Sequence, residues 1–404
     1  MVMGLVCAVN DARIVRHPYY NLMKSNSLRC NSSTIAENHC NRLVSITPSK
    51  IIHKVSMSHA QNRLAIRLVM VSLLLVSAAT SNWAAPASQV SEHYTLPGEG
   101  GWDYLTYDDP GQRLFIARSD RVQVINPASG ILMGEINNTA GVHGVALAQD
   151  LSLGFTSNGR ANTVTVFNLK TLQVQTEIAI QGTNPDAILY VPENKRVYTF
   201  NGRSHDISVI DAHSLKPVNL ISLKGRPEFA VSDGHNLYFN LEDTAQLVTM
   251  DLKTERITRT VDLAPCEEPT GLALNPKLGH LFSVCSNGLM VVVEAKTGEI
   301  LSQVAIDKEP DAAVFDSSAG NIYSSSRQGR LSVVAQDKPN HYSLVTNVAT
   351  HMGARTMALD VAHHRLFLVA ADFTPAPAAT TEQPHPRPKQ VQGTTQLLVV
   401  HTTP

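Results

Sequence analysis

Apolar and polar residues alternate along most of the chain in short segments of four to seven residues. Examples are VTVFN, which ends at Asn168, and ISVID, which ends at Asp211. Such segments are rich in Val, Ile, Thr and aromatic residues and are bounded by turns rich in Asn, Gly and Asp, which is typical of β-strands. No segment keeps a helical period of 3.6 residues over ten positions, so we predict an all-β chain.

The predicted strands recur as a four-strand unit of about 42 residues, which can be placed seven times. An aromatic residue follows the start of each unit by twelve positions, or by ten in the fourth unit. Four strands at this period are typical of a β-propeller blade, since one blade cannot bury both faces without neighbours. We therefore predict one seven-bladed β-propeller over residues 92–401. The units start at Asp103, His143, Asp186, Glu228, Thr270, Asp311 and Arg355.

The seventh unit is incomplete, with strands starting at Arg355 and Arg365 and a third strand over Gln396–His401. We expect Glu92–Pro97 to add the fourth strand, because joining the two ends of the chain removes exposed sheet edges. Residues 373–395, between the second and third strands of this unit, contain five prolines. This composition cannot form a packed core and predicts a mobile loop.

Residues 57–85 have the layout of a secretory signal peptide. Arg63 and Arg67 precede an apolar run over 68–79, which is too short for an ordinary membrane span, and small residues follow it. Because such signals lie at a true N-terminus, we interpret residues 1–56 as a misassigned extension; the alternative is an uncleaved anchor. We expect a periplasmic or secreted protein, monomeric and without a membrane span after cleavage.

Cysteine and charge agree with export. Cys266 and Cys285 lie 19 positions apart and are expected to form a disulfide. The whole chain has a net charge of -1, but residues 86–404 hold 24 Lys and Arg against 32 Asp and Glu. An acidic propeller argues against nucleic acid as a partner, because phosphates require a basic face.

Two segments carry a more specific resemblance. Phe155-Thr156-Ser157-Asn158 and Tyr198-Thr199-Phe200-Asn201 each precede a V-x-V-type strand and a turn. This arrangement resembles the YVTN-repeat propellers, the YncE-like proteins of bacteria, over 92–401, although the literal tetrapeptide does not occur. The resemblance implies an exported seven-bladed propeller, in a family whose functions are mostly unassigned. The Asn-Gly pairs at 158–159 and 201–202 also predict type I′ turns.

In a propeller, the innermost strands all start at one end of the central channel, and the loops between second and third strands lie on the same face. The seven unit-starting residues are therefore predicted to form a ring at the channel mouth, the default binding face. The surrounding loop residues are Arg160, Arg203, His205, Glu242, Asp243, Arg327 and Arg330.

Three interpretations of this ring stay open. The polar residues can line a wet channel, with the acids paired to Arg355. They can bind a divalent cation such as calcium. They can also bind an anionic or polar ligand through guanidinium groups. The cation ligands would be Asp103, Asp186, Glu228 and Asp311, with His143 as a possible nitrogen ligand, and the anion ligands would be Arg355, Arg160, Arg203 and Arg327.

The chain has no phosphate-binding glycine loop, nucleophile elbow, zinc-protease histidine pair or haem-attachment motif. We therefore expect a binding or interaction module for a protein or a small polar ligand, and no catalytic residue is assigned. The alternative is a lactonase-like, metal-assisted hydrolase at the same face, with His143 or an acid as base.

Overall fold

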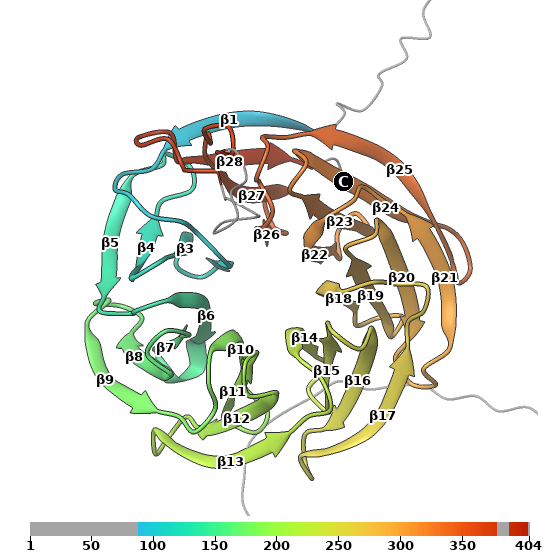
Figure 1. Ribbon diagram of the computed structural model, residues 1–404, viewed down its shortest axis with the longest axis horizontal. Helices are drawn as coiled ribbons and strands as arrows, with labels where there is room; N and C mark the ends of the chain where they lie inside the picture. The colour runs from blue at the N-terminus through green and yellow to red at the C-terminus, as the bar shows by residue number, and fades with distance from the viewer. Residues whose placement is uncertain (1–87, 378–387, 403–404) are drawn as a thin grey trace, which may run out of the picture. The chain divides into compact units, whose positions relative to one another are not determined.

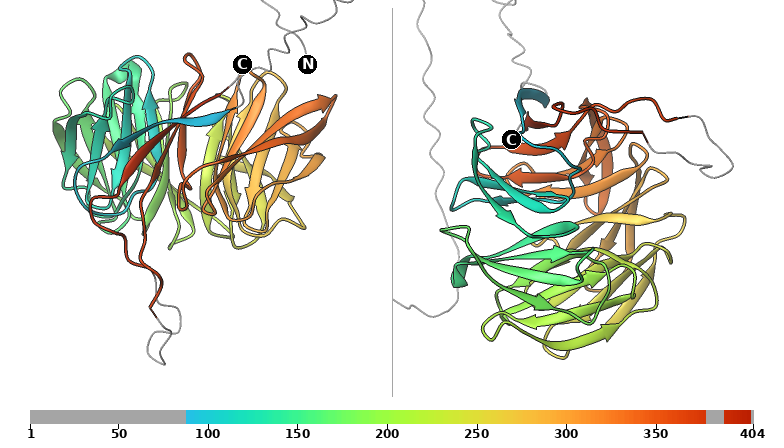
Figure 2. Two further views of the ribbon diagram at one scale, coloured as in Figure 1. Left: turned by 90° about the horizontal axis from the view of Figure 1, so that it is seen from above. Right: turned by 60° about the vertical axis from the view of Figure 1, so that its left-hand side comes forward.

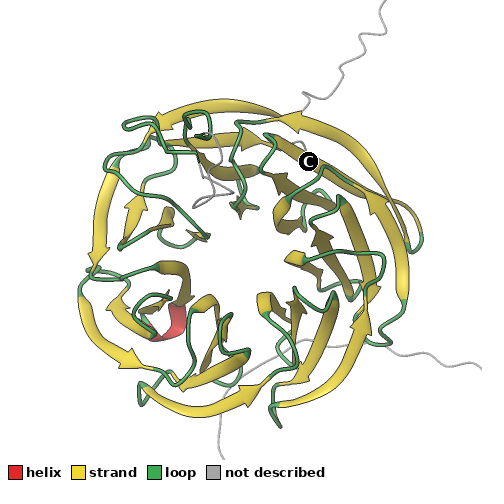
Figure 3. Cartoon of the chain, in the orientation of Figure 1, coloured by secondary structure: helices red, strands yellow, loops and turns green. Residues whose placement is uncertain are grey.

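The computed structural model describes residues 88–377 and 388–402. These residues form a ring of seven four-stranded antiparallel sheets, which confirms the predicted seven-bladed propeller (Figure 1). One 3-10 turn, η1 (Gln149–Leu151), is the only helix in the described part of the chain (Figure 3). The predicted extension (1–56) and signal peptide (57–85) lie outside the described residues.

Each blade runs from an innermost strand at the channel to an outermost strand at the rim. The innermost strands are β2 (Leu105–Asp108), β6 (Val142–Ala148), β10 (Pro185–Val191), β14 (Pro227–Ser232), β18 (Pro269–Asn275), β22 (Pro310–Asp316) and β26 (Met357–Asp360). The second strands are β3 (Arg113–Arg118), β7 (Leu153–Asn158), β11 (Arg196–Asn201), β15 (Asn236–Leu241), β19 (His280–Cys285), β23 (Asn321–Ser326) and β27 (Arg365–Ala370). The third strands are β4 (Arg121–Ile125), β8 (Thr163–Asn168), β12 (Asp206–Asp211), β16 (Gln246–Asp251), β20 (Leu289–Glu294), β24 (Arg330–Lys338) and β28 (Gln396–His401). The outermost strands are β5 (Leu132–Asn137), β9 (Val174–Ala179), β13 (Lys216–Ser222), β17 (Arg256–Asp262), β21 (Ile300–Ala305), β25 (His341–Ala349) and β1 (Gln89–Thr95).

The last blade is closed by the N-terminal strand, as predicted. Its sheet has the order β1-β28-β27-β26, and β1 pairs antiparallel with β28, with His93 opposite Leu398. The strand begins at Gln89, three residues before the predicted start, and ends at Thr95. The backbone N–H of Leu96 then donates to the carbonyl of Thr395 at 2.8 Å. The ring therefore closes through a joint between the two ends of the chain.

The core lies between blades and explains the repeated aromatic residue. All seven of these aromatic side chains, one in each second strand, are buried. Phe115 of the first blade packs against Phe167 of the second, with ring centroids 5.8 Å apart, and Phe200 of the third packs against Phe239 of the fourth at 5.6 Å. Such pairs bury one blade face on the next.

The innermost strands begin irregularly, and this irregularity positions the mouth. In β6, His143 is an extra residue between the pairs Val142–Asn158 and Gly144–Ser157. Strands β10, β14, β18 and β22 have register shifts at the same place. Such β-bulges bend the strand and change the direction of a side chain. In the first and seventh blades, Asp103 and Arg355 precede the strands instead of starting them, a correction to the predicted boundaries.

The predicted type I′ turns are wrong. Asn158 and Asn201 are buried last residues of β7 and β11, and four-residue loops follow them. The left-handed backbone lies at Asn162 (φ 55°) and His205 (φ 54°), at the far ends of these loops.

Each of the two asparagines instead links the second and third strands of its own blade. The Asn158 amide donates to the hydroxyl of Thr165 at 2.8 Å, and the Asn201 amide donates to the hydroxyl of Ser208 at 2.9 Å. The Asn of the repeated motif is therefore a buried hydrogen-bonding residue.

The predicted disulfide is present between Cys266 and Cys285, whose Cα atoms lie 5.5 Å apart. The described arms of the proline-rich segment are paired through Phe373 and Gln390 and project from one face of the ring (Figure 2). The prediction of mobility falls chiefly on 378–387, outside the described residues. None of the described helices is long and apolar enough to cross a membrane.

Candidate functional site

Three of the predicted ring residues meet at one point of the channel mouth. The Nδ1 atom of His143 lies 2.7 Å from an Asp103 carboxylate oxygen and 3.6 Å from an Asp186 carboxylate oxygen. One potential ligand atom from each side chain lies within 4.8 Å of the others. These residues come from the first three blades, so the closed ring itself assembles the cluster, which we call the Asp-His-Asp triad.

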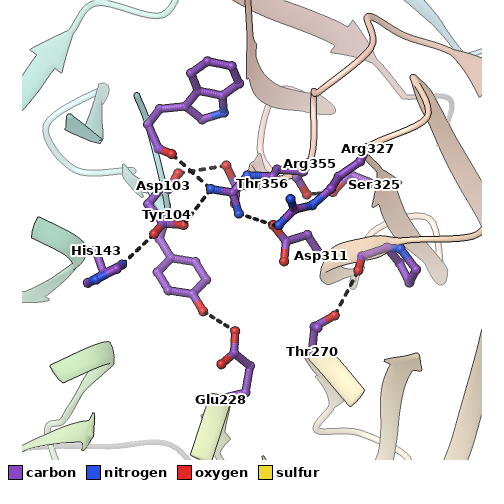
Figure 4. A network of polar contacts seen from close by, with 12 residues as sticks. Asp103, Tyr104, His143, Glu228, Thr270, Asp311, Ser325, Arg327, Arg355 and Thr356 are labelled. Atoms are coloured by element: carbon purple, nitrogen blue, oxygen red, sulfur yellow. Dashed lines mark hydrogen bonds and ion pairs between the residues drawn. The ribbon is translucent and has the colours of Figure 1, made fainter. Parts of the chain in front are cut away.

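A second group, centred on Arg355, lies beside Asp103 at the mouth (Figure 4). The guanidinium of Arg355 donates to Asp311 at 2.5 Å and to the carbonyl of Trp102 at 3.2 Å, and it lies 3.5 Å from Asp103. Arg327 lies 3.7 Å from the same Asp311 carboxylate. Arg355 and Arg327 are thus already paired with carboxylates.

Tyr104 crosses the channel below these polar groups. Its hydroxyl donates to Glu228 of the fourth blade at 3.4 Å (Figure 4). Its ring packs against Phe229 with centroids 5.4 Å apart. Beneath it lies a cavity of about 780 Å³ formed by the innermost strands and lined by apolar side chains such as Leu147 and Val231. Tyr104 therefore separates a polar mouth from a largely apolar channel.

The sequence analysis did not identify Tyr104, although a signal existed. The residue after the ring position is small in four blades, where it is Gly144, Ala187, Gly271 and Ala312. Tyr104 and Phe229 are the two large exceptions, and these two contact each other.

Two cavities adjoin the triad. The first, about 480 Å³, is lined by Asp103, His143 and Arg160 among others. The second, about 640 Å³, is lined by Asp186, Glu228 and Asp243 among others. Arg203 and Asn184 line both cavities. The exposed guanidinium groups of Arg160 and Arg203 form no ion pair within the described residues.

Two carboxyl groups of the mouth, those of Glu228 and Asp186, have raised pKa values. Burial, followed by the charges of Asp186 and Glu242, raises the pKa of Glu228 well above its usual value. Burial also raises the pKa of Asp186 to about 6, although the nearby His143 opposes the shift.

The pKa of the His143 imidazole is also raised, which favours its charged form. Burial lowers the pKa of His143, but the hydrogen bond with Asp103 and the charge of Asp186 outweigh burial, so the net shift is upward. The triad thus places two carboxylates beside one imidazole, which favours binding of a cation or proton at that point, whereas Arg160 and Arg203 bring positive charge to the cavities beside it.

The backbone under these residues is fixed by neighbouring blades. The Thr356 hydroxyl donates to the carbonyl of Asp103 at 2.8 Å, and the Ser157 hydroxyl donates to the carbonyl of Asp186. A Cβ at Gly159 would lie 2.6 Å from Nε2 of His143, so this glycine leaves room for the imidazole.

Thr270 and Arg330 have structural contacts, whereas His205 lines the second cavity. Thr270 donates its hydroxyl to the carbonyl of Pro310 at 3.1 Å and so joins two blades. Arg330 lies 3.4 Å from Asp307. Both contacts hold the polypeptide in place at the edge of the mouth.

Comparisons with solved structures agree with this architecture. The chain is similar to a hydrazine synthase chain of Kuenenia stuttgartiensis, with 17% identity, a TM-score of 0.59, and coverage of 74% of this chain and 97% of that one. It is also similar to U3-55K (9% identity, TM-score 0.63, 77% and 99% coverage) and to the RRP9 WD40 repeats (9%, 0.63, 78% and 99%). No protein-family model and no curated protein matches the chain. The likeness extends to the fold alone.

Proposed function

We propose that this chain is an exported, YVTN-like β-propeller that acts as a binding module and holds a small anionic ligand at its channel mouth. The observation that carries the proposal is the pair Arg160 and Arg203. Both line the cavities beside the triad, and neither has a carboxylate partner among the described residues. Guanidinium groups bind carboxylate and phosphate through paired hydrogen bonds.

The loops that carry these arginines are held against the rest of the propeller. The N–H of Gly159 donates to the carbonyl of Gly141 at 2.8 Å, and the N–H of Gly202 donates to the carbonyl of Asn184 at 3.0 Å. A held loop loses less conformational entropy when it binds a ligand. Of the four arginines predicted as anion ligands, Arg160 and Arg203 are therefore the two available for a ligand.

The acidic residues beside the arginines narrow the ligand class. The second cavity places the Asp243 and Glu228 side chains next to Arg203. An anion without hydrogen-bond donors would be repelled by these groups, whereas hydroxyl or amino groups would donate to them. The favoured ligand is a small molecule with one anionic group and several donors, such as a sugar acid or a sugar phosphate.

The binding proposal is tested with simple probes on metal-free protein. Calorimetric titration with glucose 6-phosphate and with gluconate is expected to show one site. An Arg160→Ala, Arg203→Ala variant should lose at least about tenfold in affinity, because a charge-assisted hydrogen bond contributes more than about 1.4 kcal/mol. Arg256→Ala, on the exposed outer strand β17, is the control and should retain affinity within about twofold. Equal affinity of wild type and double variant would refute the assignment.

The proposed export and the proposed family likeness are supported by observations other than the arginine pair. The Cys266–Cys285 disulfide is of a kind that persists in oxidising compartments. The signal-like layout over 57–85 and the YVTN-like repeats point in the same direction. We propose a periplasmic or secreted location on these grounds, which fractionation of the producing cells tests.

Metal-assisted hydrolysis is the second candidate, favoured by the Asp-His-Asp triad. A cation there could polarise a carbonyl group held by the arginines. Lactone hydrolysis that is lost on chelation and restored by added metal would support it. If the metal-loaded protein does not hydrolyse lactones, the hydrolase proposal is refuted and the binding module is the remaining proposal.

A further inference from the structure

We propose that Asp103, His143 and Asp186 bind one divalent transition-metal ion, with an open coordination position facing the channel mouth. In the described residues, this is the only group of three or more His, Cys, Asp or Glu side chains whose potential ligand atoms lie close enough to share an ion. The inference extends the proposed function by adding a metal to the same mouth.

The distances suit a metal with short bonds. Zinc binds imidazole nitrogen and carboxylate oxygen at about 2.0–2.2 Å, which places tetrahedral ligand atoms roughly 3.4 Å apart. Nδ1 of His143 lies 2.7 Å and 3.6 Å from the two carboxylate oxygens. Both distances differ from this spacing by less than about 1 Å, and the two carboxylates offer oxygens within 4.8 Å of each other.

The donor set also separates this site from a calcium site, which is one of the three interpretations that the sequence leaves open. Calcium requires about six to eight oxygen ligands, whereas imidazole suits zinc and similar metals. Two of the four carboxylates predicted to bind calcium have other contacts: Glu228 accepts the Tyr104 hydroxyl, and Asp311 pairs with Arg355. The remaining pair, with His143, forms a three-ligand site, to which Asp103 offers Oδ2 while its Oδ1 lies 3.5 Å from Arg355.

Three features outside the ligands prepare the site. The Asp103 and Asp186 backbones are each fixed by a hydroxyl of the neighbouring blade. Gly159 leaves space beside the imidazole. A cavity of about 480 Å³ joins Asp103 and His143 to Arg160. A three-ligand metal with an open position can therefore accept an oxygen of the anion that the arginines hold, provided that the proposed function is correct.

Metal binding is tested on the full chain, freed of chelator and without any anionic probe. Calorimetric titration with ZnCl₂, MnCl₂ and CaCl₂ is expected to show zinc bound most tightly and calcium most weakly. Asp186→Asn should lose one equivalent of zinc or at least about tenfold in affinity. Calcium affinity equal to that of zinc, or unchanged zinc affinity in Asp186→Asn, would overturn the proposal.

Two control variants isolate the triad. Glu242→Gln removes the same charge from the same mouth, at a residue paired with Arg226 at 2.7 Å, and should keep zinc affinity within about threefold. An equal loss in this variant would assign the binding to diffuse negative charge and refute the site. The His363→Gln, His364→Gln variant, in a hairpin of the opposite face, should keep the same equivalent of zinc, whereas loss of that equivalent would place the metal at these histidines.

A spectroscopic measurement covers the case in which Asp186→Asn does not fold. Pulsed electron paramagnetic resonance of the Mn²⁺-loaded wild-type protein is expected to show nitrogen coupling from one coordinated imidazole. His143→Gln should abolish this coupling while the control variants retain it. Absence of nitrogen coupling in the loaded wild type would refute the site. Anion binding by the metal-free protein is measured separately, so either proposal can fail without the other.

Discussion

Glu228 occupies a place where its own charge is unfavourable. It is partly buried, accepts one hydrogen bond from Tyr104, and shares the mouth with three other ring carboxylates. Burial and the charges of Asp186 and Glu242 raise its pKa well above the usual value. Because the unfolded chain keeps an ordinary pKa, ionisation favours unfolding once the pH exceeds about 4.3. Residues at a binding face commonly carry such a cost in stability.

We therefore expect Glu228→Gln to stabilise the metal-free protein at pH 7, by about 0.5–2 kcal/mol, the common gain of a stabilising substitution. The amide can still accept the Tyr104 hydrogen bond. The gain should shrink as the pH falls below about 4.3, where the wild-type carboxyl becomes increasingly protonated in the unfolded state as well as in the folded state. Urea unfolding at pH 4 and pH 7 measures the difference, with exposed Glu177→Gln on β9 as a control that should change little. A gain that is equal at both pH values would contradict this account.

At the residue scale, the sequence predicted the ring because every unit places one residue at the same offset. Periodicity assigns these residues to one face, but it does not say which side chains pair. The Tyr104–Glu228 contact joins positions 124 apart across the channel and follows from no repeat. The Asp-His-Asp triad likewise depends on the bulges that direct His143 and Asp186.

At the scale of elements, strand type and blade assignment followed from alternation of apolar and polar residues, while bulges and turns did not. Asn-Gly is a common turn pair, yet the side-chain amides of Asn158 and Asn201 donate hydrogen bonds to buried hydroxyl groups on the adjoining strands instead of forming a two-residue turn. A side chain that satisfies buried polar groups can outweigh a local turn preference. The residues with left-handed backbone in these loops are consequently Asn162 and His205.

The disulfide ties the segment before β18 to the end of β19 and joins two residues with a sequence separation of 19. A Cys266→Ala, Cys285→Ala variant should lose about 3 kcal/mol of unfolding free energy, because the unfolded chain gains conformational freedom. Urea unfolding of wild type and variant under oxidising conditions measures this loss. Anion binding should persist, because the fifth blade contributes only Thr270 to the ring. Unchanged stability would show that the disulfide does not constrain the unfolded chain.

At the scale of the molecule, closure was predictable because six complete units preceded one that lacked a strand. The bounds of the closing strand were less predictable, since β1 has a bulge between Val90 and Glu92 and no covalently adjacent partner strand. Val90 and Tyr94 pack against the cores on the two sides of the last blade. The strand therefore links both ends of the ring.

The closing strand leads to a prediction about the removal of N-terminal residues. Removal of residues up to Thr95 would expose the edge of β28 and lose the β1 hydrogen bonds, each contributing about 0.5–1.5 kcal/mol. We expect this truncation to destabilise the propeller by about 3 kcal/mol or more and to cause self-association, measured by urea unfolding and light scattering. A chain that starts at Ser88 retains all of β1; it is the control and should show neither effect. Under the proposed export, a cleaved signal peptide would have to end before Gln89, and mass spectrometry of the mature protein tests this. A mature N-terminus within β1 would contradict the proposal.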